Sequence, residues 1–406
     1  MSRLKELIDE FCPDGVEYKA LSELFDIRNG YTPSKKNLAF WDGGTHPWFV
    51  MEDIRRDGTI LKDSLAHITD AAIKKGLFPA NSIIVATSAT IGVHALVTVD
   101  FLCNQRFACM TIKKKYADIL DIRYAYQAFF ALDRWCLEHV DQGNFATVNS
   151  AALKMYRIPV PPIEIQREIV RILDSFQELD DALTAEIEAR EKQIVSVADE
   201  LILKSVPKTD WKPLNEVGQL QRGKRFTFAQ MSETGDLGCI HYGDVYFLPT
   251  AVSEVKTFLN NDDVKSPRLA LPGDVVFSCT SEITDTVGRA VAWLGSQPVA
   301  VHDDCQILHH DMDATYVSYF AQTRSFNKQK MKGVTRSKIA RLSGEWLGKV
   351  RIPVPSMNRQ HEIVEYLSSI ETLVGQLRVE RDARRKQFAY YRDKLLSFPE
   401  KVTTNG

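Results

Sequence analysis

One segment occurs twice in this chain, and the internal repeat constrains its architecture more than any other feature. The stretch Arg-Ile-Pro-Val-Pro at 157–161 recurs at 351–355, an offset of 194 residues. At that offset, and without gaps, residues 157–203 and 351–397 are identical at 20 of 47 positions. Chance does not produce such agreement. We infer that a duplication built the chain from two equivalent halves.

Both copies of the repeat are predicted to be long helices. Proline is tolerated in a first helical turn, and after the Pro-containing start none follows until Pro207 and Pro399. Eight of ten heptad seam positions are apolar in each copy, which favours two paired helices of roughly 42 residues and ~63 Å. The alternative is that each helix packs only on its own domain. The seam residues include Ile169, Leu173, Phe176, Leu183, Ile187, Ile194 and Leu201 in the first copy, and Ile363, Leu367, Ile370, Leu377, Phe388 and Leu395 in the second.

The repeat also wraps around the ends of the chain. Residues 6–8 and 13 (Glu, Leu, Ile and Pro) match residues 200–202 and 207 at the same offset of 194. The N-terminal segment therefore copies the end of the central helix. We expect residues 1–15 to dock beside the end of the C-terminal helix.

Two globular domains are predicted between the repeated segments. Each begins with short β-rich segments, continues with a helix at about 118–140 or 314–330, and ends with a loop that contains Gly143 or Gly333. The β-rich segments are 82–87, 94–99 and 107–112 in the first domain, and 274–279, 289–294 and 299–308 in the second. The predicted fold class is α+β: two α/β domains joined by two long helices in an antiparallel coiled coil, with an internal pseudo-twofold repeat. The expected boundaries are 1–15, 16–156 for the first domain, 157–205 for the central helix, 206–350 for the second domain, 351–400 for the C-terminal helix, and 401–406 for a tail.

Charge is distributed unevenly, although the net charge is only −2. Residues 163–204 contain eleven acidic and five basic residues, so the rest of the chain is mildly basic, which is compatible with nucleic-acid binding. The apolar runs are far shorter than the ~20 residues of a membrane span, and the first residues lack the apolar stretch of a signal peptide. The seven cysteines form no Cys-x-x-Cys pair. We therefore expect a cytoplasmic protein with reduced thiols and no membrane contact.

Two divergent domains, each followed by Ile-Pro-Val-Pro, a Gln-x-Glu-Ile-Val stretch and a long helix, resemble the specificity subunits of type I restriction-modification systems. The opening Cys-Pro-Asp-Gly-Val-Glu at 12–17 and the ending Arg-Asp-Lys-Leu-Leu at 392–396 are similar to the same family. The resemblance covers essentially the whole chain. It implies two target-recognition domains, each of which reads half of a bipartite site in double-stranded DNA.

The resemblance also implies partners. These are two methyltransferase subunits that use S-adenosylmethionine and two restriction subunits that use ATP and Mg. This chain is then expected to bind no cofactor and to catalyse no reaction.

The arrangement suggests how such a chain would read DNA. Two domains repeated along a chain become related by a pseudo-twofold axis if their long helices pack antiparallel. Each domain then faces the opposite strand, as in dimeric readers of half-sites. We expect the helices to set the distance between half-sites and the domains to supply base identity. Because the two domains differ in sequence, the site is expected to be asymmetric.

The first candidate for DNA contact is an acid-free basic run in the second domain, with a solvated helix face as the alternative. The run contains Arg324, Lys328, Lys330, Lys332, Arg336, Lys338 and Arg341. Further candidates, with ordinary turns as the alternative, are Arg222, Lys224 and Arg225, and the counterpart segment with Arg28, Asn29 and Tyr31. In the first domain Asn144, Thr147 and Asn149 occupy the place of the basic run without its charge, so Lys35 and Lys36 are added as candidates.

The rival hypothesis is a stand-alone enzyme that modifies DNA. The sequence contains no Gly-x-x-x-x-Gly-Lys-Ser/Thr loop, no Asn-Pro-Pro-Tyr/Phe segment and no serine-nucleophile elbow. His302, Asp303 and Asp304 could suggest metal ligands, but the alternation over 299–310 suits a strand with one polar face, and the predicted counterpart at 103–106 is Cys-Asn-Gln-Arg. We therefore expect neither a metal site nor a catalytic residue. A purely structural coiled-coil scaffold would explain the helices but not two elaborate domains.

Overall fold

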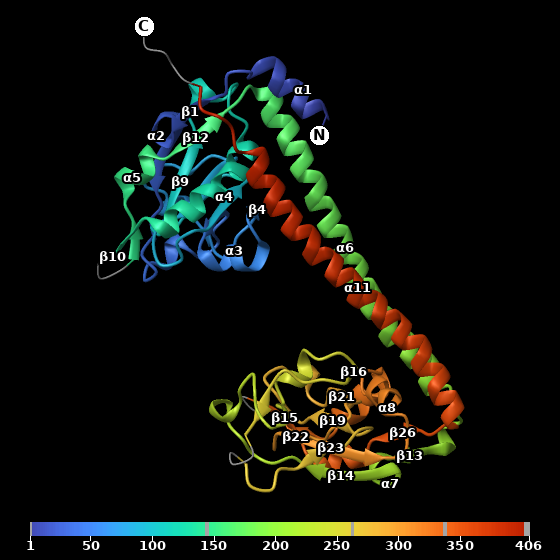
Figure 1. Cartoon of the computed structure of the whole chain (residues 1–406). Coiled ribbons are helices and arrows are strands. Elements are labelled where there is room, and N and C mark those ends of the chain that lie inside the picture. Colours follow the sequence, from blue (N-terminus) through green and yellow to red (C-terminus); the bar gives the residue numbers. More distant parts are fainter. Residues whose placement is uncertain (1, 143–145, 261–263, 336–338, 402–406) are drawn as a thin grey trace. The chain divides into compact units, whose positions relative to one another are not determined.

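The computed structural model describes residues 2–142, 146–260, 264–335 and 339–401 (Figure 1). The chain divides into two compact units: unit 1 contains residues 1–181 and 382–406, and unit 2 contains residues 182–381. The helices α6 (Ile163–Leu203) and α11 (Met357–Leu395) each give one part to unit 1 and the other part to unit 2. Each unit therefore consists of one α/β domain and two helical segments.

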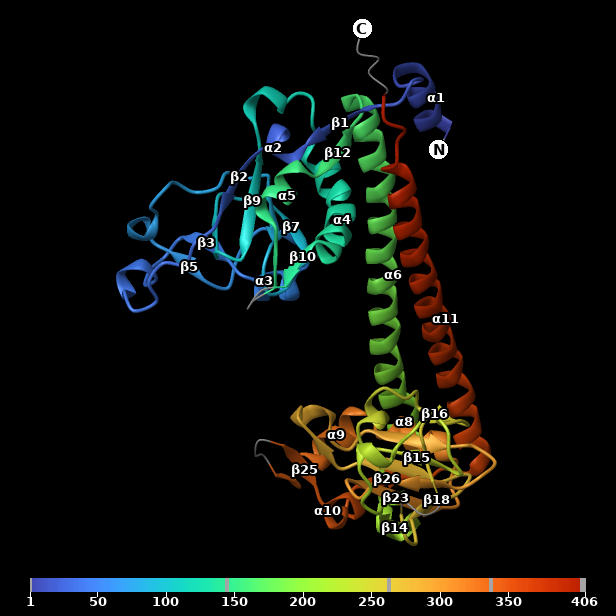
Figure 2. The ribbon, with the colours of Figure 1, turned by 60° about the vertical axis from the view of Figure 1, so that its left-hand side comes forward.

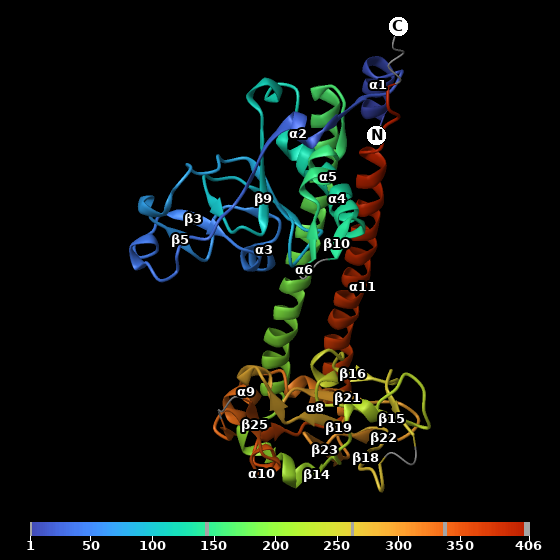
Figure 3. The same ribbon diagram turned by 90° about the vertical axis from the view of Figure 1, so that its left-hand side faces the viewer.

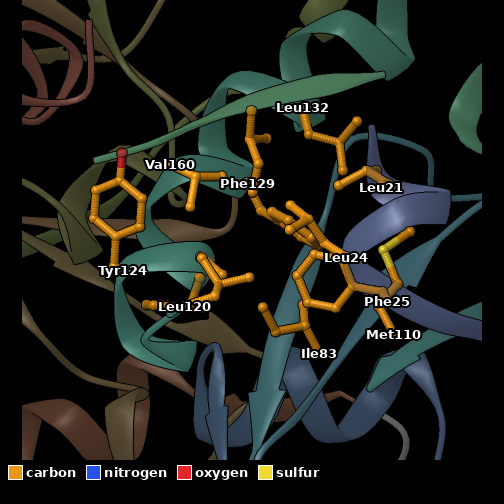
Figure 4. Close-up of a cluster of buried hydrophobic side chains, with 14 of the residues drawn as sticks. Leu21, Leu24, Phe25, Ile83, Met110, Leu120, Tyr124, Phe129, Leu132 and Val160 are labelled. Atoms are coloured by element: carbon orange, nitrogen blue, oxygen red, sulfur yellow. The ribbon is translucent and has the colours of Figure 1, made fainter. Parts of the chain in front are cut away.

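The centre of unit 1 is a mixed sheet with the strand order β2-β9-β6-β7-β4 (Figure 2). On one face of this sheet, Ile83 and Val85 of β6 share a core with Phe129 of α4 (Figure 4). Ile84 and Ala86 of the same strand belong to a second core on the other face. This alternation is that of a strand buried on both faces. The helices of the domain are α1 (Ser2–Phe11), α2 (Leu21–Leu24), α3 (Met51–Asp57), α4 (Ile122–Glu138) and α5 (Ser150–Met155). The strands are β1 (Glu17–Ala20), β2 (Phe25–Asn29), β3 (His46–Phe49), β4 (Ile60–Leu61), β5 (His67–Ile68), β6 (Ser82–Ala86), β7 (His94–Val97), β8 (Leu102–Cys103), β9 (Phe107–Ile112), β10 (Val140–Gln142), β11 (Ala146–Val148) and β12 (Arg157–Val160).

Unit 2 repeats the main sheet of unit 1 strand by strand. Its main sheet has the order β14-β23-β19-β21-β16 (Figure 3). Val275 and Phe277 of β19 point into a core shared with α8 and α9, whereas Val276 belongs to the opposite core. The helices are α7 (Leu214–Val217), α8 (Ala314–Phe320), α9 (Arg324–Lys330) and α10 (Gly344–Gly348). The strands are β13 (Trp211–Pro213), β14 (Gly218–Arg222), β15 (Leu237–Ile240), β16 (Ala251–Val252), β17 (Phe258–Leu259), β18 (Leu269–Ala270), β19 (Val275–Ser278), β20 (Thr280–Ser281), β21 (Ala290–Trp293), β22 (Val299–Val301), β23 (Cys305–His310), β24 (Val334–Thr335), β25 (Ala340–Leu342) and β26 (Arg351–Pro353).

Residues that are identical in the two copies of the repeat make the same contacts in both units. Gln166 Oε1 accepts a hydrogen bond from the backbone N of Asp121 at 2.8 Å, and Gln360 Oε1 accepts one from that of Asp313 at 2.9 Å. The two aspartates are the N-caps of α4 and α8. The first strand of each domain also pairs with its Ile-Pro strand, β1 with β12 and β13 with β26. The repeated motif is therefore the joint between each domain and its helical segments.

Within each unit the segments of α6 and α11 pack antiparallel. In unit 1, Phe176 contacts Phe388 and Tyr391, with ring centroids 5.9 and 5.8 Å apart, and Arg385 forms a bidentate ion pair with Asp180 at 2.7 and 2.8 Å. In unit 2, an arginine of α11 forms an ion pair with a glutamate of α6. All of the predicted apolar seam residues named above are buried or half-buried in their own units. The predicted fold class, with two α/β domains, antiparallel long helices and an internal repeat, is confirmed.

The start of the chain meets its end in unit 1. The backbone N of Val16 donates to Pro399 O at 2.9 Å, and Tyr18 Oη donates to Phe398 O at 2.8 Å. Gly15 has a φ of +92°, and a Cβ there would collide with the carbonyl group of Pro399, so this contact requires glycine. Residues that follow α11 therefore form part of the same joint as β1.

The prediction of one continuous strand over 299–308 is wrong. A turn at 302–304 separates β22 from β23. His302 Nδ1 accepts a hydrogen bond from the backbone N of Asp304 at 3.2 Å, and the backbone N of Cys305 donates to His302 O at 3.0 Å. These local bonds favour a turn over a continued ladder, and the turn brings two carboxylates to the surface.

The single helix predicted over 314–330 is likewise divided in the structure. Helix α8 ends at Phe320, and α9 begins after Thr323, whose side chain accepts a hydrogen bond from the backbone N of Phe326 at 3.2 Å. Threonine is a favoured N-cap, so a new helix starts there.

Candidate nucleic-acid interface

A groove in unit 2 is formed by two adjoining cavities of about 510 and 470 Å³. Both cavities are lined by Arg222, Asp303, Asp304 and Arg341, and the second is also lined by Arg225. Three guanidinium groups and three carboxylates, the third from Glu345 in the first cavity, therefore face one concave surface, here called the unit 2 groove. Guanidinium groups are suited to both phosphates and guanine edges.

Close backbone turns place the side chains of the groove. Arg222 is the last residue of β14 and lies opposite Gln306 of β23. Gly223 follows, and a Cβ there would collide with the carbonyl oxygen of His302, so only glycine lets these two turns approach so closely. Arg341 comes from β25, where it lies opposite a residue of β20. The groove is thus assembled from three separate parts of the second domain.

The charged groups of the groove are held by specific hydrogen bonds. Arg222 donates from Nε to Asp303 O at 2.7 Å and from Nη2 to Asp303 Oδ2 at 3.2 Å. Thr280 Oγ1 donates to Asp304 Oδ1 at 3.0 Å. The side chains of Asp303 and Asp304 are 28% and 26% exposed. Both carboxylates are therefore fixed in orientation and still accessible.

Aromatic rings line the other side of the groove. His241 lies 4.4 Å from the ring centroids of both His302 and Phe228. Burial, assisted by the neighbouring His302, lowers the pKa of His241 to about 4, so this imidazole is neutral at pH 7. The positive charge of the groove therefore comes from its guanidinium groups, while Phe228, which is 69% exposed, offers an apolar face.

In the part of the chain that the structure describes, the ligand atoms of His302, Asp303 and Asp304 lie within 4.8 Å of one another. Each of these residues already has a partner in the protein: His302 Nδ1 bonds the backbone of Asp304, Asp303 bonds Arg222, and Asp304 bonds Thr280. A guanidinium group in contact with Asp303 opposes a metal cation there. The absence of a metal site stays a prediction from the sequence.

The structure separates the residues of the predicted basic run. Arg341 lines the unit 2 groove, and Lys328 and Lys332 are exposed. Arg336 and Lys338 lie outside the described residues. The run is therefore not one continuous patch of a single helix face.

Lys330, one member of the basic run, is buried rather than exposed to solvent. Lys330 is only 3% exposed, and its amine lies 5.7 Å from the ring centroid of Phe326. Its predicted DNA contact is wrong, because α9 packs this side chain against the core. Arg324 is exposed but lies 3.3 Å from Asp199 of α6, so it links α9 to the helix pair.

Unit 1 contains a surface equivalent to the unit 2 groove. The backbone N of Gly30 donates to the first carbonyl oxygen of β9 at 3.0 Å, and the backbone N of Gly223 donates to the first carbonyl oxygen of β23 at 3.1 Å. At either glycine a Cβ would collide with a facing carbonyl oxygen. The counterpart of Arg222 is therefore Asn29. The predicted match of 28–31 with 222–225 is out of register by one residue.

Equivalent backbone hydrogen bonds extend this comparison to other positions. Val148 N donates to Thr87 O in unit 1, and Leu342 N donates to Cys279 O in the equivalent bond of unit 2. The residues that precede the two donors, Thr147 and Arg341, are therefore equivalent. The corresponding pairs in units 1 and 2 are Asn29 and Arg222, Thr32 and Arg225, Gln105 and Asp303, and Thr147 and Arg341. Unit 1 thus presents amides and hydroxyls where unit 2 presents charges.

Three predicted contact residues hold loops of their own unit. Arg28 and Tyr31 donate to carbonyl groups within 72–77, at 2.6 Å from Arg28 Nη1 and 2.7 Å from Tyr31 Oη, and both line a cavity of about 280 Å³. Lys224 donates to carbonyl groups of 265–266. These donors are engaged by the protein itself, so we give the three side chains a structural role.

The other unit 1 candidates are distributed over the domain. Asn149 Oδ1 accepts hydrogen bonds from the first backbone N–H groups of α5 at 3.0 and 3.1 Å, so it is an N-cap. Lys35 and Lys36 are exposed in the loop after β2. Asn144 lies outside the described residues.

Sequence reasoning did not name Gln105 as a contact residue and considered Asp303 only as a metal ligand. Gln105 lies in the turn between β8 and β9, and Asp303 in the turn between β22 and β23. In unit 1, Asn104 Oδ1 accepts a hydrogen bond from the backbone N two residues later at 3.0 Å, as His302 Nδ1 does in unit 2. An asparagine at this position is a recognisable turn signal, so the unit 1 turn could have been found.

The family model described as "Type I restriction modification DNA specificity domain" matches residues 13–190 and 208–380, which are most of the chain. The chain belongs to this family. Each matched segment contains one α/β domain with the helix that follows it, so the match is itself duplicated.

Relatives in the specificity-domain family support the assignment. The EcoprrI specificity subunit of Escherichia coli is 47% identical over 194 residues, which are 46% of this chain and 47% of that protein. The EcoR124I/EcoR124II specificity subunit of Escherichia coli is 29% identical over 267 residues, 62% of this chain and 65% of that protein. The chain thus spans about half to just under two thirds of these relatives.

One solved structure shares the fold. It comes from work on "complex assembly" and "conformational transition of the type I R-M system", and it covers 95% of this chain and 97% of its own at 15% identity, with a TM-score of 0.63. In the described parts of this chain, no helix combines the length and the apolar character needed to cross a membrane.

Proposed function

We propose that this chain is the DNA-reading, non-catalytic specificity subunit of a type I restriction-modification complex. Each unit reads one half of an asymmetric bipartite site in duplex DNA, and α6 and α11 set the spacer between the halves. The chain directs two methyltransferase subunits, which use S-adenosylmethionine, and two restriction subunits, which use ATP and Mg²⁺. Methylation and cleavage belong to those partners.

The proposal rests mainly on the equivalent groove positions of the two units. Equivalent backbone positions present Arg222 and Arg341 in unit 2, and Asn29 and Thr147 in unit 1. A protein that reads two different half-sites needs one frame with two sets of groove side chains. A purely structural scaffold has no need for this difference.

The helices support a spacer role. Helix α6 has 41 residues, which is about 60 Å at ~1.5 Å per residue. We expect that lengthening both helices by one turn near 183–187 and at the facing part of α11 changes the spacer and leaves both half-sites unchanged. A change in the bases selected would contradict the spacer role.

A selection experiment tests the proposal directly. The full chain, assembled with its methyltransferase subunits, is incubated with a library of random duplexes, and the bound fraction is sequenced. The expected result is two short, unlike half-sites at a fixed separation. Binding without sequence preference would overturn the proposal.

The same preparation distinguishes the enzyme hypothesis. The chain alone is incubated with the selected duplex and S-adenosylmethionine. We expect no methyl transfer until methyltransferase subunits are added. Methylation by the isolated chain would show a catalytic site and contradict the non-catalytic role.

A further inference from the structure

The unit 2 groove contains a joined pair of opposite charges where its two cavities meet. Arg222 donates from Nε to the backbone oxygen of Asp303 and from Nη2 to Asp303 Oδ2, so two hydrogen bonds orient the guanidinium group. The Arg222 side chain is 64% exposed and the Asp303 side chain 28%. Both residues line both cavities. The pair is therefore oriented by the protein and open to a ligand.

The carboxylate restricts what this part of the groove can face. A carboxylate repels phosphate, so a groove that holds DNA must turn Asp303 towards a base edge rather than towards the backbone. In the major groove the donors on base edges are the amino groups of cytosine and adenine. Adenine shows its N7 acceptor beside the amino group, which a carboxylate also repels, whereas cytosine has no acceptor there. Cytosine N4 is the better match.

The guanidinium selects the other half of the same base pair. Guanine presents N7 and O6 as neighbouring acceptors, and arginine donates to both. Nε and one hydrogen of Nη2 bond Asp303, which leaves Nη1 and the second Nη2 hydrogen of Arg222 as donors. A carboxylate offers about four lone-pair positions, so Asp303 can accept another hydrogen bond.

We propose that Arg222 and Asp303 together read one G·C pair of the unit 2 half-site, with Arg222 on guanine N7 and O6 and Asp303 on cytosine N4. The inference rests on the proposed function, since it requires DNA in the unit 2 groove.

The equivalent positions of unit 1 provide a contrast. They hold Asn29 and Gln105, which are both exposed, and the Oε1 of Gln105 accepts a hydrogen bond from Thr32 Oγ1. Side-chain amides combine a donor and an acceptor, which suits adenine rather than a G·C pair. Unit 1 therefore supplies a matched control on the same frame, because changes at these two positions should alter only the other half-site.

The test uses the full chain with its methyltransferase subunits and the duplex selected from the random library. First, each guanine of the unit 2 half-site is replaced singly by 7-deazaguanine, which lacks N7, and each cytosine by N4-methylcytosine, which lacks the major-groove N–H. One G·C pair should be sensitive to both replacements, each weakening binding roughly 5- to 150-fold.

Next, the same duplexes are bound by Arg222→Ala and by Asp303→Ala, since asparagine would keep an amide oxygen that accepts from cytosine N4. Arg222→Ala should lose its sensitivity to 7-deazaguanine at that pair, and Asp303→Ala its sensitivity to N4-methylcytosine. Asp311→Asn, which removes a carboxylate outside the groove, and Gln105→Ala, which changes unit 1, should both keep the sensitivities of the unaltered chain at the unit 2 half-site.

The outcomes separate this inference from the proposed function. If the unaltered chain selects a bipartite site but no G·C pair of the unit 2 half-site responds to both base analogues, the reading by Arg222 and Asp303 is wrong and the proposed function stands. If both variants retain full sensitivity, the inference is also wrong. If the unaltered chain selects no sequence, both fail together.

Discussion

The two units of this molecule have one scaffold and different side chains at equivalent surface positions. Gln166 and Gln360 accept hydrogen bonds from equivalent N-cap backbone N–H groups, and they lie in the segment that the sequence repeats. Asn29 and Arg222 occupy equivalent backbone positions, at the ends of β2 and β14, but they differ in charge and in hydrogen-bonding character. The sequence is thus repeated where side chains hold a domain to its helices and divergent where they face a groove. The residues that hold each domain to its helices and the residues that differ between the two surfaces are therefore separate sets.

The largest difference in stability between the units is expected when one of the glycines that let the turns approach closely is replaced. Gly223→Ala places a Cβ against the carbonyl oxygen of His302. We expect a loss of at least about 3 kcal/mol in the stability of unit 2, because the backbone must shift. Hydrogen exchange of the β19 amides measures that unit alone, and those of β6 should be unaffected.

Two further variants complete this experiment. Gly30→Ala should reverse the pattern, with faster exchange in β6 and none of the change in β19, since its Cβ would meet the backbone at Cys103 and Asn104. Gly375→Ala is the control, because nothing lies within 4 Å of its Cβ in helix α11. An equal loss in both units from a single glycine would mean that the units do not fold separately.

Gln166 and Gln360, which bond the helix N-caps of their domains, should contribute equally to the stability of the two units. Gln166→Ala and Gln360→Ala each remove a buried side chain that accepts a hydrogen bond from a partly buried N-cap backbone N–H, at a cost of about 2 kcal/mol. The two losses should agree within ~0.5 kcal/mol, each in its own unit, by hydrogen exchange. Gln177→Ala, at an exposed position of α6, should change stability by less than ~0.5 kcal/mol. Clearly unequal losses for the two buried glutamines would refute the equivalence of the joints.

Sequence reasoning reached the scaffold because its contacts are encoded twice. The repeated glutamine at 166 and 360 and the Ile-Pro strands mark the joints, and the heptads mark the helix pair. Such contacts depend on residue type and spacing, which a repeat displays directly.

The groove could not be predicted to the same extent. Whether Lys330 points to solvent depends on which face of the seven-residue helix α9 packs on the sheet, and so short a helix shows little periodicity. The turn at His302 depends on a side chain that accepts a backbone hydrogen bond, a role for which histidine is not a usual signal. The predicted match was out of register because it aligned Arg28 with Arg222. The equivalent residues of the two turns are the glycines, which the close backbone approach requires.

Acid should affect the two units differently. His241 has its pKa lowered to about 4 in the folded protein, whereas an unfolded histidine titrates near 6.5. The unfolded chain therefore binds more protons between these values, and unit 2 loses stability as the pH falls through that window, by roughly 1 kcal/mol from pH 7.5 to 5.5. Val50 follows β3 in unit 1 as His241 follows β15 in unit 2, so the stability measured at the β6 amides should lack this contribution. His241→Val should remove the His241 contribution from β19 and leave that of His310, whose pKa burial also lowers. A pH dependence that is unchanged by this substitution would contradict the assignment.

The grooves should also differ in their response to salt. Arg341→Ala should lower the slope of log binding constant against log salt by about 1, because a guanidinium group is lost from the unit 2 groove. Thr147→Ala, at the equivalent position of unit 1, should leave the slope unchanged. Equal slopes for the unaltered chain and Arg341→Ala would remove this residue from the DNA interface.

The smallest effect is expected at the helix pair. Arg385 and Asp180 form a bidentate pair, but the arginine side chain is 54% exposed. A double-mutant cycle with alanine at both positions should give a coupling energy of about 0.5 kcal/mol, measured by denaturant unfolding of unit 1. A coupling well above 1 kcal/mol would show that charge pairs, rather than the apolar seam, hold the helices.

The central claim is that either domain can occupy either place on the repeated scaffold and read its own half-site there. The most direct test replaces residues 209–350 by a second copy of residues 16–156. Both segments begin just before the first strand of their domain and end just before the Ile-Pro strand that pairs with it. The duplexes that the altered chain selects with its methyltransferase subunits are then sequenced. We predict a symmetric site that contains the unit 1 half-site twice, on opposite strands. A folded chain that still selects the original asymmetric site, or that selects none, would contradict the account.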